Sequence, residues 1–185
     1  MNLARHCNLC ENEMTSLEKG LTCKLTNKNP DFNNTCSKIN LDKKLKEKLE
    51  IANLELEIIH RNKKSTHLTF YSTIIIGFSL IIGGYLFSSW TIYSLFLWTV
   101  KIGIIAGGFA FLGVAYSKLN RFRKKNKKAQ LEKRKIDEVL EKYGIEYSTI
   151  FDFKEKIHGT QEVTVNLEFK NWTKRQTTNT YKFDY

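Results

Sequence analysis

Residues 68–116 read LTFYSTIIIGFSLIIGGYLFSSWTIYSLFLWTVKIGIIAGGFAFLGVAY and contain one charged residue, Lys101. A helix needs about 20 mostly apolar residues to cross a hydrocarbon core of about 30 Å, so the run is long enough for two crossings. We expect them at about 68–87 and 97–116, joined by the uncharged connector 88–96. The sequence therefore predicts a mainly α-helical membrane protein with a two-helix transmembrane hairpin over 68–117.

The connector and the single lysine each have a simple interpretation. Trp90 and Tyr93 in the connector belong to residue types that favour the headgroup level of a bilayer. Lys101 lies near the outer end of the second predicted crossing, where its apolar stem favours snorkelling of the ammonium group to the interface. A functional lysine facing a pore is the alternative.

Basic residues flank the hairpin on both sides, whereas the connector has none. Arg61, Lys63 and Lys64 precede the first crossing. The cations that follow the second crossing are Lys118, Arg121, Arg123, Lys124, Lys125, Lys127 and Lys128. The positive-inside bias then places both termini in the cytoplasm. Because the first 60 residues are polar and lack a cleavable signal pattern, we expect a multi-pass protein of the bacterial inner membrane.

The same cluster accounts for most of the net charge of +11. Residues 118–135 hold ten Lys and Arg against the single acid Glu132. Anionic headgroups attract a cation at this position by about 1 kcal/mol. Binding to the bilayer surface is thus a sufficient explanation of the basic run, and nucleic-acid binding is disfavoured.

Small residues recur at a spacing of four in both crossings. Ser79 and Gly83 form such a pair in the first crossing, and Gly103 and Gly107 form one in the second. Further small residues stand near these pairs: Gly77 and Gly84 in the first crossing, and Ala106, Gly108, Ala110 and Gly113 in the second. This spacing lets helix backbones approach closely in lipid. We favour helix packing within the hairpin, and homo-oligomerisation through the surplus small residues is the alternative.

Two helices are predicted beside the hairpin, an amphipathic stalk helix at 41–67 and a basic juxtamembrane helix at 118–144. Both have an apolar stripe at helical spacing. The stripe residues are Leu41, Leu45, Leu49, Ala52, Leu56 and Ile59 in the first helix, and Leu119, Phe122, Ile136, Val139, Leu140 and Tyr143 in the second. Gly144 suits a C-cap. We expect the two stripes to pair as a short coiled-coil stalk, and docking of a partner helix is the alternative.

The segment 145–185 changes to the period-two pattern of β-strands. Val163, Val165, Leu167 and Phe169 alternate with polar residues, which is typical of a half-buried strand. Similar patterns around 147–153 and 181–185 predict a small antiparallel meander. A unit of this size is marginally stable alone. We expect the helix near 131–143 to cover its apolar face.

The segment 1–40 contains all four cysteines of the chain: Cys7, Cys10, Cys23 and Cys36. The expected cytoplasmic location disfavours disulfides. Four thiolates in a segment with few large apolar residues are typical of a minidomain stapled by a structural Zn²⁺ ion. An iron–sulfur cluster and free, redox-active thiols are the alternatives. His6 is a possible substitute ligand, although its position next to Cys7 makes simultaneous binding strained.

The pattern Cys-x2-Cys, followed by KGLTCKLTNKNPDF at residues 19–32 and then Cys36, resembles a module of uncharacterised small bacterial membrane proteins. There it stands at the amino end, before membrane helices. The resemblance covers about residues 5–40. It implies that the four cysteines act as one unit, and it implies no substrate.

Motifs of known enzymes are missing from the sequence, including a His-Glu-x2-His metal motif and a phosphate-binding glycine loop. We therefore do not expect an enzyme. An integral membrane scaffold or adaptor that binds an unknown protein partner explains the features best. An oligomeric, pore-forming two-helix subunit is the first alternative, and a thiol-based redox or metal sensor is the second.

Overall fold

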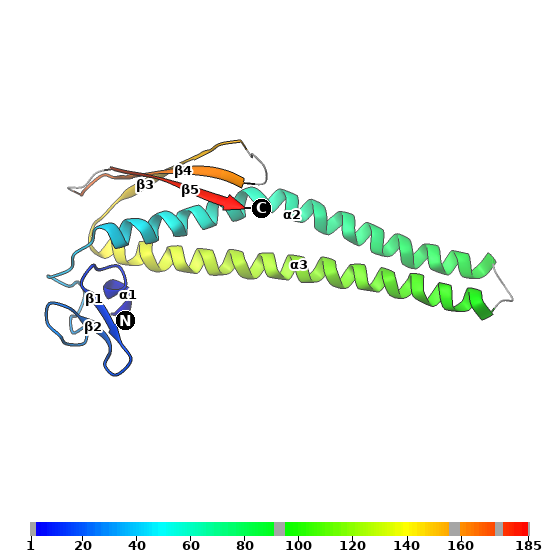
Figure 1. The fold of residues 1–185 in the computed structure, drawn as a ribbon, viewed down its shortest axis with the longest axis horizontal. Coiled ribbons are helices and arrows are strands. Elements are labelled where there is room, and N and C mark those ends of the chain that lie inside the picture. The colour runs from blue at the N-terminus through cyan, green and yellow to red at the C-terminus, as the bar shows by residue number, and fades with distance from the viewer. Residues whose placement is uncertain (1–2, 91–94, 156–159, 173–175, 185) are drawn as a thin grey trace. The chain divides into compact units, whose positions relative to one another are not determined.

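The computed structural model describes residues 3–90, 95–155, 160–172 and 176–184 (Figure 1). Two helices of 48 residues each dominate it, α2 (Lys43–Trp90) and α3 (Leu95–Lys142). The chain divides into two compact units. We call Met1–Glu57 with Ala129–Tyr185 the head, and Ile58–Lys128 the hairpin unit. The mainly helical fold with small antiparallel sheets confirms the coarse prediction.

The remaining elements all belong to the head. A one-turn helix α1 (Ala4–Cys7) precedes a hairpin of β1 (Glu13–Ser16) and β2 (Gly20–Cys23). The second sheet consists of β3 (Tyr147–Phe153), β4 (Thr160–Phe169) and β5 (Gln176–Asp184), antiparallel in the order β3-β4-β5. The predicted meander is thus confirmed. The β1–β2 hairpin was not predicted, because its four-residue strands carry no clear apolar alternation.

In the hairpin unit, α2 and α3 are each long and apolar enough to span a membrane. Both helices extend into the predicted connector, since α2 continues to Trp90 and α3 begins at Leu95. The described helices thus include residues 88–90 and 95–96 of the predicted connector, and the bounds of the two crossings stay a prediction. Tyr93, and the side chain of Trp90, lie outside the described part of the chain.

Glycines set the closest approach of the two helices. A Cβ built on Gly108 would lie 2.6 Å from Ile81 Cγ1 and 2.8 Å from the Gly77 carbonyl oxygen. A Cβ on Gly77 would lie 2.9 Å from Leu112 Cδ2, and one on Gly84 would lie 3.0 Å from Ile105 Cγ1. These contacts fix the separation of the helices, because a larger side chain has no room there.

The glycines that the sequence singled out for packing within the hairpin lie elsewhere. A Cβ on Gly83, Gly103 or Gly107 would meet nothing within 4 Å, and Ser79 is exposed. These positions therefore lie away from the contact between α2 and α3, and a role for them in helix packing stays a prediction. Gly77, Gly84 and Gly108 form the intrachain contact instead.

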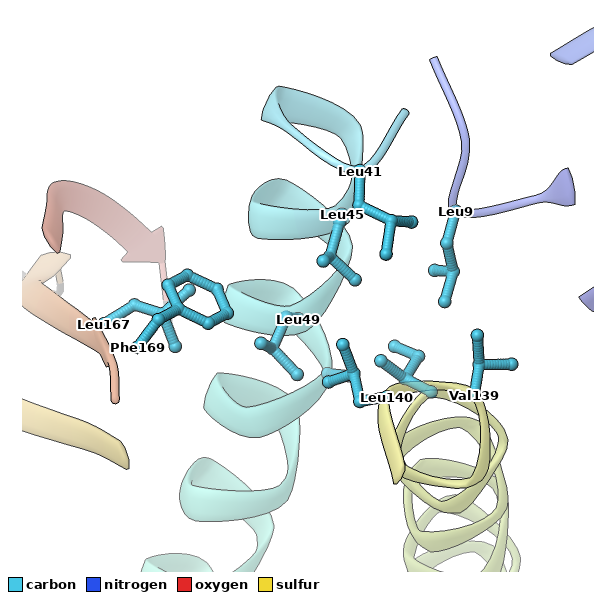
Figure 2. Close-up of a cluster of buried hydrophobic side chains, with 10 residues drawn as sticks. Leu9, Leu41, Leu45, Leu49, Val139, Leu140, Leu167 and Phe169 are labelled. Carbon is cyan, nitrogen blue, oxygen red and sulfur yellow. The ribbon is translucent and has the colours of Figure 1, made fainter. Parts of the chain in front are cut away.

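The core of the head combines segments that are far apart in the chain (Figure 2). Its buried residues come from the segment before β1, from α2 and the residue Leu41 just before it, from α3 and from β4. They are Leu9, Leu41, Leu45, Leu49, Ala52, Ile136, Val139, Leu140, Leu167 and Phe169. Part of each predicted apolar stripe, at 41–52 and at 136–140, therefore lies in one cluster, which also includes Leu9, Leu167 and Phe169. Pairing of the full stripes as a coiled coil stays a prediction. Burial of such side chains stabilises the head by about 1.5–3 kcal/mol for each large residue.

The meander packs on α2 as well as on α3. Leu167 and Phe169 share the core with Leu45 and Leu49 of α2. Glu50 of α2, whose exposed fraction is 0%, accepts hydrogen bonds from three side chains of β5. The prediction that the helix near 131–143 covers the sheet was therefore incomplete, since α2 supplies the buried acid that binds β5.

The helix ends are closed by specific contacts. The Lys44 N–H at the start of α2 donates to Glu11 Oε1 at 2.6 Å, which satisfies one free donor of the first turn. Gly144 has a φ of +64°, and the Ile145 N–H donates to the Leu140 carbonyl at 3.1 Å. This is the predicted glycine C-cap of α3.

Candidate metal centre

Three short segments position the four cysteines. Cys7 ends α1, and Cys10 follows in a turn whose Cys10 N–H donates to the Cys7 carbonyl at 2.9 Å. Cys23 ends β2 and begins a second tight turn, in which the Asn27 N–H donates to the Cys23 carbonyl at 2.8 Å. Cys36 lies between this turn and α2. We call residues 3–40 the cysteine module.

All four cysteines line one cavity of ≈ 370 Å³. His6, Lys28, Phe32 and Lys38 are among the other residues around it. Within the described ranges, no three His, Cys, Asp or Glu side chains are grouped closely enough to hold an ion. The four thiols thus surround a common cavity without meeting at one point, and metal binding requires their side chains to turn inward.

Backbone N–H groups point at two of the sulfur atoms. Cys10 Sγ accepts from the Asn12 N–H at 3.4 Å and from the Asn40 N–H at 3.3 Å. Backbone hydrogen bonds from Leu25, and then from Thr26, lower the pKa of the Cys23 thiol. Such donors stabilise the negative charge of a thiolate, the form that binds metals.

Cys7 differs from Cys23 in its electrostatics. Burial raises the pKa of the Cys7 thiol, and the neighbouring Cys10, Cys36 and Cys23 raise it further by charge repulsion. A cation among them would reverse this effect, because it attracts every thiolate.

His6 is held as a core residue. It is 2% exposed, its Nδ1 lies 3.1 Å from Tyr143 Oη, and its ring meets Phe32 and Tyr143 edge-on. Burial, reinforced by the charge of Lys142, lowers the pKa of His6 and favours the neutral ring. These contacts occupy the side chain that was considered as a substitute ligand.

Tyr143 connects the cysteine module to the end of α3. Its hydroxyl accepts the Cys36 N–H at 2.9 Å and also contacts His6. Arg5 makes a second link, a hydrogen-bonded ion pair with Glu138 at 2.6 Å. The sequence indicated Tyr143 only as the last member of an apolar stripe, and no spacing signal pointed to its polar contacts.

The module is also joined to α2. Lys44 forms an ion pair with Glu13, and Lys48 Nζ donates to the Asn8 carbonyl at 2.8 Å. Within the module, the Glu11 N–H donates to the Asn40 carbonyl at 2.9 Å. The module is thus linked to the first turns of α2 and to the end of α3.

The predicted membrane-surface residues lie along α3 in the hairpin unit. All seven are exposed: Lys118, Arg121, Arg123, Lys124, Lys125, Lys127 and Lys128. Lys101, by contrast, is 9% exposed. Its side chain is therefore largely covered by other residues of the chain, and the snorkelling position stays a prediction.

No family model, curated protein or solved structure matches the chain.

Proposed function

We propose that the protein is an integral membrane scaffold or adaptor. In this proposal, the hairpin unit crosses the bacterial inner membrane twice and holds the head on the cytoplasmic side. Both termini are then cytoplasmic. The basic residues on either side of the apolar run support this orientation, because cytoplasmic flanks of membrane helices are enriched in Lys and Arg.

The observation that carries the proposal is the apolar surface of the hairpin unit. Only 11% of the most apolar 18-residue stretch of α2 is buried, and only 17% of the corresponding stretch of α3. Core helices of soluble proteins bury such residues, and soluble monomers rarely expose contiguous apolar patches beyond a few hundred Å². The large exposed side chains are Leu68, Tyr71, Ile75, Ile76, Phe78, Ile82, Tyr85, Leu86, Val100, Ile102, Phe109, Phe111, Val114 and Tyr116.

The exposed basic run supports contact with anionic lipid. The basic run follows the apolar part of α3 directly, and its last residue, Lys128, is also the last residue of the hairpin unit. Seven exposed cations at this point fit a headgroup layer of negative charge. Exposed cations near 61–64 occupy the corresponding position before the apolar part of α2.

The adaptor role rests on the sheet of the head. In the described strands, β3 and β5 each pair only with β4, so each presents an outer edge. Such edges accept an added strand from a protein partner.

A homo-oligomer, including the pore-forming alternative, is the second candidate. Outward-facing Gly83, Gly103 and Gly107, together with exposed Ser79, favour it, since small residues permit close packing between copies. The sensor alternative is favoured by the shared cavity of the four cysteines.

Extraction from bacterial membranes tests the proposal. We expect the expressed protein to remain in the membrane pellet through both high salt and alkaline carbonate. A variant with Lys124, Lys125, Lys127 and Lys128 changed to Gln should remain there too, because the apolar helices provide the main attachment. Release of wild type by carbonate would contradict a spanning hairpin. Light scattering in detergent distinguishes a monomer from the ring-like oligomer that a pore requires.

A further inference from the structure

The cysteine module has a feature that a scaffold role leaves unexplained. All four cysteines of the chain, drawn from three segments, surround one cavity, and that module is fixed to both stalk helices. We propose that Cys7, Cys10, Cys23 and Cys36 bind one Zn²⁺ ion as a tetrathiolate, and that this ion fastens the module to the core of the head. The proposal is independent of the membrane placement.

The donor set favours zinc. Four thiolates at the corners of a tetrahedron are a common structural zinc set, with Zn–S distances of about 2.3 Å. Soft sulfur ligands exclude Mg²⁺ and Ca²⁺, which prefer oxygen. His6 does not complete the set, because its Nδ1 is engaged by Tyr143 and its ring is packed between Phe32 and Tyr143.

The surroundings of the sulfurs suit a bound tetrathiolate. Up to four thiol protons leave as four Zn–S bonds form, so the complex has a net charge of about −2. The N–H donors on Cys10 Sγ and the cations Lys28 and Lys38 at the cavity face that charge. These groups are in place before the sulfurs turn inward, which lowers the reorganisation that binding requires.

The route from the ion to the head core is short. Leu9 lies between Cys7 and Cys10, is 3% exposed, and belongs to the core cluster. On the other side of the cavity, the Cys36 N–H donates to Tyr143 of the α3 end. Fixing the three sulfurs of these cysteines therefore fixes Leu9 and Tyr143. Loss of zinc should loosen the core and not only the module.

Metal content is the first test, on full-length protein purified in detergent. We expect about one zinc per chain, with X-ray absorption showing four sulfur neighbours. Cys36→Ser should reduce zinc at least about tenfold. Thr35→Ser, next to it on the same cavity, is the matched control and should retain the metal.

The second test follows Trp172, which packs against Phe169 with ring centroids 4.7 Å apart. Trp90→Phe and Trp98→Phe leave it as the only tryptophan. In this variant, removal of zinc by a chelator should shift the Trp172 emission and lower the unfolding midpoint that it reports. Re-addition of zinc should restore both.

The outcomes separate the two parts of the proposal. Protein without zinc, or zinc with nitrogen or oxygen neighbours, overturns the tetrathiolate. If zinc is lost and both the emission of Trp172 and the unfolding midpoint stay unchanged, the proposed connection between the ion and the core of the head is overturned. Thiols that oxidise and recover reversibly, in protein free of metal, would overturn the site in favour of the sensor alternative.

Discussion

Glu50→Ala is expected to destabilise the head by about 2–4 kcal/mol. The carboxylate is fully buried and accepts hydrogen bonds from Asn179 Nδ2 and Tyr181 Oη, both at 2.7 Å, and from Thr177 Oγ1 at 3.0 Å. Removing it leaves these three donors without their acceptor and opens a space under β5. Hydrogen bonds to a charged acceptor are among the stronger ones in proteins, so the loss is large.

Thermal unfolding and hydrogen exchange measure this loss. We expect the unfolding midpoint to fall by about 10 °C, and the amides of β5 to lose protection before those of β3. Glu55→Ala, in the same helix, is the matched control, because Glu55 is exposed. Equal effects of the two substitutions would show that the bonds from Glu50 to β5 contribute little.

Gly108→Leu is expected to separate the two helices of the hairpin unit. A Cβ at this position already lies 2.8 Å from the Gly77 carbonyl oxygen, which is backbone and cannot rotate away. Overpacking of this kind costs about 1–3 kcal/mol. The substitution should therefore lower the thermal stability of the protein in detergent, measured by the temperature at which the hairpin unit loses helical signal.

Gly107→Leu is the control for this prediction, since a Cβ at Gly107 meets nothing within 4 Å. Gly107→Leu changes side-chain volume and helix propensity by the same amount as Gly108→Leu, one residue away in the same helix. Gly107→Leu should leave the stability of the hairpin unit nearly unchanged. If Gly107 instead faces another copy of the chain, its substitution will lower the oligomer mass without separating the helices. Equal destabilisation of monomers by both changes would contradict the glycine contact.

Much of the fold was predictable because its signals are local. The apolar run between residues 68 and 116 indicated the two long helices, and alternation around Val163 and Val165 indicated β4. The C-cap at Gly144 also followed from residue type. That α2 continues to Trp90 was not predictable in the same way, because the sequence around Ser88 carries no clear helix-stopping signal.

Contacts between distant segments were harder to predict. Glu50 stands in a stalk helix among other charged residues, so its sequence environment resembles a solvated face. Its burial becomes evident only when β5, more than 120 residues later, is placed against it. Likewise, the spacing of four selected Gly83 and Gly107 rather than their neighbours Gly77 and Gly108, because spacing does not determine which face meets the partner helix.

The candidate metal centre was predictable in composition but not in context. The Cys7 and Cys10 spacing and the polar surroundings indicated one cysteine unit before any geometry was known. The contacts of Tyr143 with Cys36 and His6, and the burial of Leu9, depend on how the module docks. No pattern within residues 3–40 specifies that docking.

Paired reporter fusions test the central claim, a membrane-spanning hairpin with both termini on the cytoplasmic side. Alkaline phosphatase is active only in the periplasm, and green fluorescent protein fluoresces only in the cytoplasm, because it does not mature when it is exported unfolded. Each reporter is fused separately to each end of the chain in a Gram-negative bacterium. We predict fluorescence and no phosphatase activity at both ends. Phosphatase activity at either end would contradict the orientation and would return disulfide bonding of the cysteines to consideration.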